Sequence, residues 1–113
     1  MTQLDQLTEF DFYRRLAASS GVSLVLFSGP DCGACRRAET MLSEALAGTE
    51  VHLFKVDVQK SMALAREYEV FHLPALFLFV DGHYHAPLHN ALSPAALRQA
   101  VAAALQSPSQ EAP

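Results

Sequence analysis

Three strongly apolar runs recur along the chain, at residues 22–27, 51–57 and 75–80, and turn-forming residues bound them. Short apolar runs of this kind are typical of strands that a sheet buries on both faces. A weaker strand is expected over residues 2–7. The pattern therefore predicts a central sheet that is covered by helices on both sides.

Apolar residues at helical spacing lie before and after the first run. Thr8 is the expected N-cap of a helix that ends near Ser19, with Asp11 in the capping-box position. A second helix is predicted to open at residues 31–35, because apolar residues then recur at spacings of three and four as far as Gly48. Its expected apolar face comprises Ala34, Ala38, Met41, Leu42, Ala45 and Leu46.

The second half of the chain adds a hairpin and two helices. A short helix is expected over residues 61–68, the Asp-Gly pair at residues 81–82 indicates a tight hairpin turn, and a strand returns over residues 83–88. Ser93 caps the last helix, with Pro94 at its first position. The expected buried face of that helix comprises Leu97, Val101, Ala104 and Leu105. The predicted order is β-α-β-α-β-α-β-β-α, an α/β fold with a mixed sheet.

The composition fits one folded domain. The chain has 113 residues and a mass of 12.3 kDa; half of its residues are hydrophobic and 18% are charged. We place this domain at residues 1–106. Residues 107–113 are polar and contain two prolines, so we expect them to form a disordered C-terminal tail.

Charge and hydropathy argue against several classes of partner. A formal net charge of −4 is unsuited to binding nucleic acid or an anionic membrane surface, both of which attract clustered positive charge. No apolar run approaches the ~20 residues that cross a bilayer. The first fifteen residues do not show a basic stretch followed by an apolar one, so we expect no secretory signal and a cytoplasmic location.

The two cysteines of the chain, Cys32 and Cys35, fall at the junction of a buried strand and a helix. Their spacing on the first helical turn brings the two sulfur atoms within disulfide reach. The first cysteine meets the partial positive charge of the helix N-terminus, which favours its nucleophilic thiolate form, and the second lies deeper. A Cys-x-x-Cys pair beside a βαβ pattern thus indicates dithiol–disulfide redox chemistry.

The chain resembles the thioredoxin family over roughly residues 2–106. The matching stretches are Leu24-Val25-Leu26-Phe27, the Cys32–Cys35 motif, Phe54-Lys55-Val56-Asp57, Tyr68-Glu69-Val70, Leu73-Pro74-Ala75-Leu76-Phe77-Leu78-Phe79, Asp81-Gly82 and Ala91-Leu92-Ser93. The resemblance implies the thioredoxin fold and dithiol–disulfide exchange on protein substrates. It also implies that a separate reductase or dithiol donor regenerates the Cys32–Cys35 couple, with no organic cofactor or metal. We expect a monomer.

The resemblance also assigns roles to single residues. Cys32 corresponds to the attacking cysteine of the family and Cys35 to the resolving cysteine. Pro74 corresponds to the family's cis-proline, which faces the disulfide and offers backbone to a bound substrate strand. The expected substrate-binding residues are Leu73, Pro74, Gly33 and Ala34.

Several positions depart from the family. Asp31 and Ala34 stand where the family usually has tryptophan and proline. Leu26 replaces a buried aspartate that is thought to move the proton of the resolving cysteine, although Lys55, the usual partner of that aspartate, is retained. Because Leu26 cannot accept a proton, proton transfer at Cys35 must use water or another group. Asn90 stands where a glycine usually lies.

Asp31 and His72 are candidates for tuning the Cys32 pKa. A carboxylate about 6 Å from the sulfur costs the thiolate between ~0.7 kcal/mol in water and ~2.8 kcal/mol near a protein surface. A helix N-terminus returns ~0.3–1 kcal/mol, up to ~2 kcal/mol. Asp31 is therefore expected to offset much of this gain, unless it points into solvent. A protonated His72 would act in the opposite sense, although an exposed loop histidine is the favoured interpretation.

The sequence leaves other functions open. The domain is alternatively a thioredoxin-like binding module or a redox sensor with weak exchange activity. A metal or iron–sulfur site built from two Cys-x-x-Cys motifs across a dimer is disfavoured by the helix-start placement of the cysteines. His83 and His85 form a pair that can bind zinc or copper, but a polar strand face is the favoured interpretation and we expect no metal site.

Overall fold

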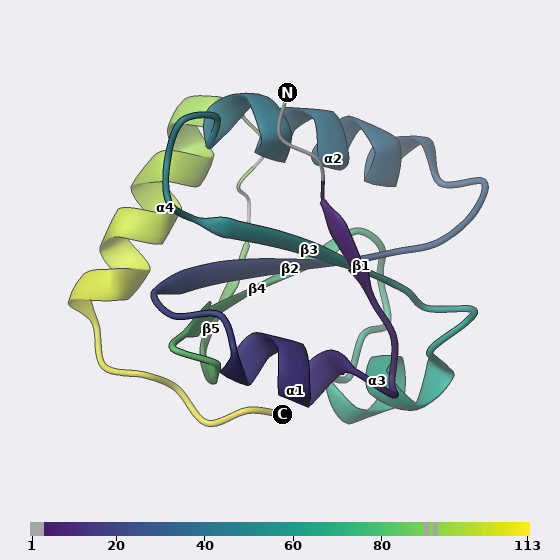
Figure 1. The fold of residues 1–113 in the computed structure, drawn as a ribbon. Helices are drawn as coiled ribbons and strands as arrows, with labels where there is room; N and C mark the ends of the chain where they lie inside the picture. Colours follow the sequence, from purple (N-terminus) through teal and green to yellow (C-terminus); the bar gives the residue numbers. More distant parts are fainter. Residues whose placement is uncertain (1–3, 90, 92) are drawn as a thin grey trace.

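The computed structural model describes residues 4–89, 91 and 93–113 (Figure 1). Within these residues the elements are β1 (Asp5–Leu7), α1 (Phe12–Ala17), β2 (Val22–Ser28), α2 (Gly33–Ala45), β3 (His52–Asp57), α3 (Met62–Glu67), β4 (Ala75–Val80), β5 (His83–Leu88) and α4 (Pro94–Gln106). Their order confirms the predicted one. Thr2 and Gln3 of the first predicted strand, and also Asn90 and Leu92, lie outside the described residues.

The five strands form one mixed sheet in the order β1-β3-β2-β4-β5. β1 and β2 pair parallel with β3, whereas β4 runs antiparallel to β2, and β5 runs antiparallel to β4. The long, apolar strands β2 and β4 lie in the interior of the sheet, as expected for strands that are buried on both faces. The carboxyl end of β2 therefore lies beside the amino end of β4. This brings the loop that follows β2 next to the loop that precedes β4.

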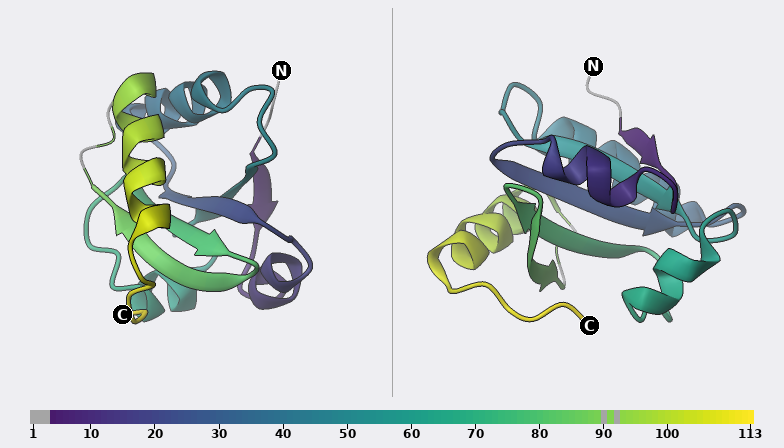
Figure 2. Two further views of the ribbon diagram at one scale, coloured as in Figure 1. Left: turned by 90° about the vertical axis from the view of Figure 1, so that its left-hand side faces the viewer. Right: turned by 60° about the horizontal axis from the view of Figure 1, so that its bottom comes forward.

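Helices cover both faces of the sheet. α2 and α4 lie on one face and α1 and α3 on the other (Figures 1 and 2). The core under α1 and α3 is largely aromatic, and the core under α2 and α4 is aliphatic. The first includes Phe12, Phe27, Tyr68, Phe77 and Phe79; the second includes Leu24, Leu26, Leu42, Leu78 and Leu97.

The first helix begins later than the sequence predicts. Its N-cap is Asp11 rather than Thr8, and it ends at Ala17. Residues 8–11 form a turn in which the Thr8 N–H donates to Asp11 Oδ1 over 2.7 Å. The Thr8 hydroxyl oxygen accepts from the Phe10 N–H over 3.2 Å. These are bonds of the kind that the predicted cap makes, but they close a single turn, and the regular helix begins only at Phe12.

Two residues of the predicted apolar helix faces are exposed. Ala34 lies in the first turn of α2, where Cys35 takes the buried position. Leu105 in the last turn of α4 is 42% exposed. It lies eight residues after the fully buried Leu97, and at 3.6 residues per turn this rotates it roughly 80° away from the sheet.

Residues 107–113 follow α4 without regular secondary structure. The Gln110 N–H donates to the His85 carbonyl oxygen over 2.7 Å, so this segment touches β5. The division into a domain and a disordered tail stays a prediction. Among the helices described, none has the length and apolar character needed to cross a membrane.

Candidate active site

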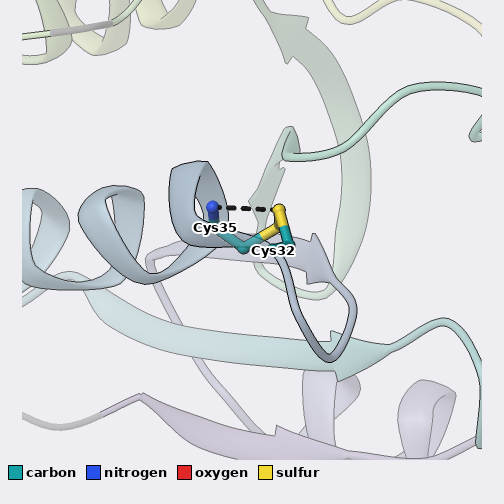
Figure 3. The surroundings of a disulfide bond; sticks show 2 residues. All are labelled: Cys32 and Cys35. Atoms are coloured by element: carbon teal, nitrogen blue, oxygen red, sulfur yellow. Dashed lines mark hydrogen bonds between the residues drawn. A yellow bond between two sulfur atoms is a disulfide. The ribbon is translucent and has the colours of Figure 1, made fainter.

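Cys32 and Cys35 form a disulfide where the loop after β2 enters α2 (Figure 3). Their Cα atoms are 5.2 Å apart. Cys32 is the N-cap of α2, and its sulfur accepts a hydrogen bond from the Cys35 N–H over 3.1 Å. The first sulfur thus lies at the end of a 13-residue helix, where unpaired N–H groups and the helix dipole favour negative charge.

The two cysteines differ in exposure. Cys32 is partly exposed, whereas Cys35 is only 2% exposed and faces the sheet. Cys35 therefore lies deeper than Cys32, as its place on the first helical turn predicts. The roles of the two sulfur atoms in exchange stay a prediction.

The loop before β4 packs beside the disulfide loop. The Leu73–Pro74 peptide bond is cis, as the family resemblance implies. Leu73 Cδ1 lies 3.0 Å from the position that a Cβ atom would take on Gly29, so a side chain there would displace Leu73. Gly29 was not singled out from the sequence, although a glycine directly before a functional loop is a signal of close backbone approach.

An apolar pocket of about 430 Å³ opens next to the motif. It brings together two of the predicted substrate-binding residues, Ala34 and Pro74, with Arg37 at its border. Gly33 is partly exposed, and the Arg37 Nη1 atom lies 3.4 Å from the position that a Cβ atom would take on it. The remaining lining residues are Leu26, Ala38, Met41, Leu42, Leu76, Leu88 and Ala91.

The two residues expected to tune the pKa of Cys32 are both exposed. Asp31 adopts a left-handed conformation with φ 57°. Two arginines, Arg36 and Arg37, directly follow the motif. The ion pairs in the described part of the chain are Asp11–Arg15 and Glu39–Lys55, so neither of these arginines pairs with Asp31. His72 is an exposed loop histidine. Their tuning of Cys32 stays a prediction.

Leu26 occupies the position of the family's aspartate and is almost fully buried under α2. Lys55 lies next to it in β3, in register with Leu26. The Lys55 Nζ atom pairs instead with Glu39 Oε1 of α2 over 2.9 Å. Glu39 was not singled out from the sequence, although its position four residues after Cys35 on one helix was a usable signal.

One histidine of β5, His85, has a structural contact that explains it. A β-bulge leaves His85 without a partner in β4, and its Nε2 atom lies 2.6 Å from the Ala104 carbonyl oxygen of α4. Within residues 4–89, 91 and 93–113, no group of three or more histidine, cysteine, aspartate or glutamate side chains is placed to hold a metal ion.

Comparisons with known proteins agree with this geometry. The family description "Thioredoxin" matches residues 3–103. Thioredoxin of Staphylococcus aureus strain Mu50 is 35% identical over 79 residues, which cover 68% of this chain and 74% of that protein; strain USA300 gives the same values. The zinc-bound form of human ERp44 superposes with a TM-score of 0.75 at 20% identity, over 90% of this chain but only 30% of that one.

A disulfide at a helix N-terminus, next to a cis-proline on a mixed five-stranded sheet, defines a thiol–disulfide oxidoreductase. The match along nearly the whole length and the 35% identical relatives show that the chain belongs to the thioredoxin family.

Proposed function

We propose that the protein is a protein-disulfide reductase in which Cys32 attacks the substrate disulfide and Cys35 resolves the resulting mixed disulfide. The observation that carries this assignment is the asymmetry of the pair. Cys32 is partly exposed and its sulfur accepts a hydrogen bond from the Cys35 N–H over 3.1 Å, whereas Cys35 is buried. A thiolate is the nucleophile in exchange, and the helix N-terminus favours it at Cys32.

Leu73 and Pro74 hold the substrate chain beside Gly33 and Ala34. Support comes from the pocket that Ala34 and Pro74 share and from the partly exposed Leu73. Phe71, two residues before Leu73, is 82% exposed. Exposed aromatic and aliphatic side chains on the loop that packs beside the disulfide loop suit a polypeptide substrate better than a small thiol, because they offer apolar contact area.

The remaining partners follow from the family. The Cys32–Cys35 couple is the redox group, without an organic cofactor or a metal, and a reductase or another dithiol donor returns it to the dithiol form. We place the protein in the cytoplasm as a monomer. Gel filtration coupled to light scattering tests the last point, since a monomer has a mass of 12.3 kDa.

Substitution of single cysteines tests the roles. In a Cys35→Ser protein the mixed disulfide cannot be resolved, so substrate proteins are expected to stay attached through Cys32. The matched Cys32→Ser protein is expected to trap nothing. If a Cys32→Ser/Cys35→Ser protein retains its partners, the chain is a binding module and the reductase assignment is wrong.

The direction of exchange is tested by equilibration in redox buffers. A reductant has a potential below that of the cytosolic glutathione pool, and 30 mV corresponds to about 1.4 kcal/mol for this two-electron couple. The pair is expected to remain a disulfide in glutathione at a cytosolic ratio and to be reduced by dithiothreitol. Full reduction by glutathione alone indicates an oxidant instead.

A further inference from the structure

Replacement of the family's aspartate by Leu26 does not leave the surroundings of Cys35 without a carboxylate. Glu39 follows Cys35 by four residues in α2, and residues at this spacing lie on one face of a helix with Cβ atoms about 5–6 Å apart. Helical side chains tilt toward the helix N-terminus. The Glu39 side chain therefore covers the turn that contains Cys35.

Lys55 fixes the position of this carboxylate. The Lys55 Nζ atom lies 2.9 Å from Glu39 Oε1, and the two side chains are only 36% and 27% exposed. Lys55 is in register with Leu26 in the neighbouring strand, so its side chain emerges on the same face of the sheet, under α2. The ion pair thus bridges α2 and β3 beside Leu26.

The geometry points to Glu39 as the group that accepts the proton of Cys35 during resolution, with Lys55 holding its carboxylate in place. This inference rests on the proposed roles of the two cysteines. A general base acts directly or through one water molecule, and Glu39 lies on the same helix face as the thiol. Asp31 is nearer in sequence to the motif but is exposed before the helix, whereas Cys35 faces the sheet.

The Cys32 thiolate forms a bond to one substrate sulfur, and the other substrate sulfur leaves as a thiolate that takes a proton from water. The Cys35 thiol then gives its proton to Glu39, and its sulfur bonds to Cys32 while the bond from Cys32 to the substrate breaks. The second substrate thiolate leaves and takes up this proton by way of solvent. Two electrons pass from the dithiol to the substrate disulfide.

The test compares Glu39→Gln with Glu44→Gln, which alters an exposed glutamate of the same helix. Reduced protein is mixed with a disulfide-containing protein, the reaction is stopped with acid, and the mixed disulfide is followed by mass spectrometry. General bases contribute typically 10²–10⁴-fold. Because the Glu39 carboxylate is partly solvated, we expect decay of the mixed disulfide to slow at least about tenfold in Glu39→Gln, with its formation unchanged and Glu44→Gln at the wild-type rate.

A second variant separates proton transfer from packing. Leu26→Asp in the Glu39→Gln background returns a carboxylate to the same face beside Lys55, and it is expected to restore fast decay. Equal slowing of formation and decay in Glu39→Gln, or no slowing of either, overturns the role of Glu39. If the Cys35→Ser protein forms no mixed disulfide at all, the proposed function fails first, which is a distinct result.

Discussion

The backbone N–H of Cys35 donates a hydrogen bond to the sulfur of Cys32 across the first turn of α2, over 3.1 Å. In the dithiol form the same N–H is available to a Cys32 thiolate, and hydrogen bonding to the charged form lowers the pKa of a thiol. The preceding residue, Asp31, carries a negative charge that opposes this effect. The reactivity of Cys32 therefore depends on the balance between one backbone donor and one neighbouring carboxylate.

Removal of the Asp31 charge is expected to activate Cys32. Asparagine tolerates the left-handed conformation of residue 31 at φ 57°, so Asp31→Asn removes the charge with little backbone strain. Because Asp31 is exposed, its effect lies near the water limit of ~0.7 kcal/mol, which corresponds to roughly threefold faster alkylation of reduced protein below the pKa of Cys32. Iodoacetamide alkylation measured against pH gives the rate and the pKa together.

Salt and a remote charge provide the controls for this variant. The difference between Asp31→Asn and wild type is expected to shrink in 1 M salt, where the Debye length falls to about 3 Å. Asp5→Asn, at an exposed residue of β1, is expected to alkylate like the wild type. An identical pH profile for Asp31→Asn at low salt means that the carboxylate points away from the sulfur.

Phe71 is expected to contribute to substrate binding rather than to chemistry. Its ring is 82% exposed on the loop that leads to Leu73 and Pro74. Phe71→Ser is expected to raise KM for a disulfide-containing protein severalfold, since burying a phenyl side chain contributes ~1.5–3 kcal/mol and only part of it is covered in a complex. The rate with a small disulfide such as hydroxyethyl disulfide is expected to stay unchanged.

The control for Phe71 is an exposed apolar residue elsewhere. Leu105→Ser alters the last turn of α4, at the opposite side of the molecule from the β2–α2 loop (Figure 1). It is expected to leave KM for both disulfides unchanged. If Phe71→Ser affects the protein and the small disulfide equally, the ring supports the site instead of contacting the substrate.

The fold and the disulfide were predictable because their signals are local. The apolar run at residues 22–27, the cysteine spacing and the Asp-Gly turn each depend on a few neighbouring residues, and each prediction agrees with the structure. The predicted start of α1 was wrong because Thr8 and Asp11 make their capping bonds around a single turn, and the regular helix begins only after it, at Phe12.

The residues that the sequence analysis missed act through tertiary contacts. The carboxylate of Glu39 is held by its ion pair with Lys55. Lys55 lies sixteen positions later in the chain and reaches Glu39 only because β3 packs under α2. Gly29 matters because Leu73 of a distant loop approaches it. The spacing of Glu39 from Cys35 and the place of Gly29 before the motif mark the two positions, but neighbouring residues do not identify the distant partner that each one contacts.

Two leucines of α4 are expected to differ sharply in their contribution to stability. Leu97 is fully buried in the core between α4 and the sheet face that α2 also covers, whereas Leu105 is 42% exposed. Leu97→Ala is expected to lower the free energy of unfolding by about 2–5 kcal/mol through lost burial and a cavity, whereas Leu105→Ala changes it by less than about 1 kcal/mol. Urea unfolding of the oxidised proteins measures both. Similar losses in the two variants contradict the orientation of α4.

Alkaline pH is expected to destabilise the fold through Tyr68. Its side chain is 4% exposed among Phe12, Phe27 and Phe77, and burial, with Glu67 nearby, raises the pKa of Tyr68 to about 12. The unfolded chain loses this proton near pH 10. Between about pH 10 and pH 12 the unfolded state therefore binds fewer protons than the folded state, and stability falls as pH rises.

The variant Tyr68→Phe isolates this loss because it keeps the ring and removes the ionising group. The stability contributed by the neutral hydroxyl is fully present below pH 10, and on the order of 2 kcal/mol of it is lost by pH 12. Burial also raises the pKa of Tyr84, so the variant retains a weaker alkaline decline. Urea unfolding at pH 8 and pH 11 is expected to show a larger drop for the wild type than for Tyr68→Phe. Equal drops in the two proteins indicate that Tyr68 ionises as readily in the folded as in the unfolded chain.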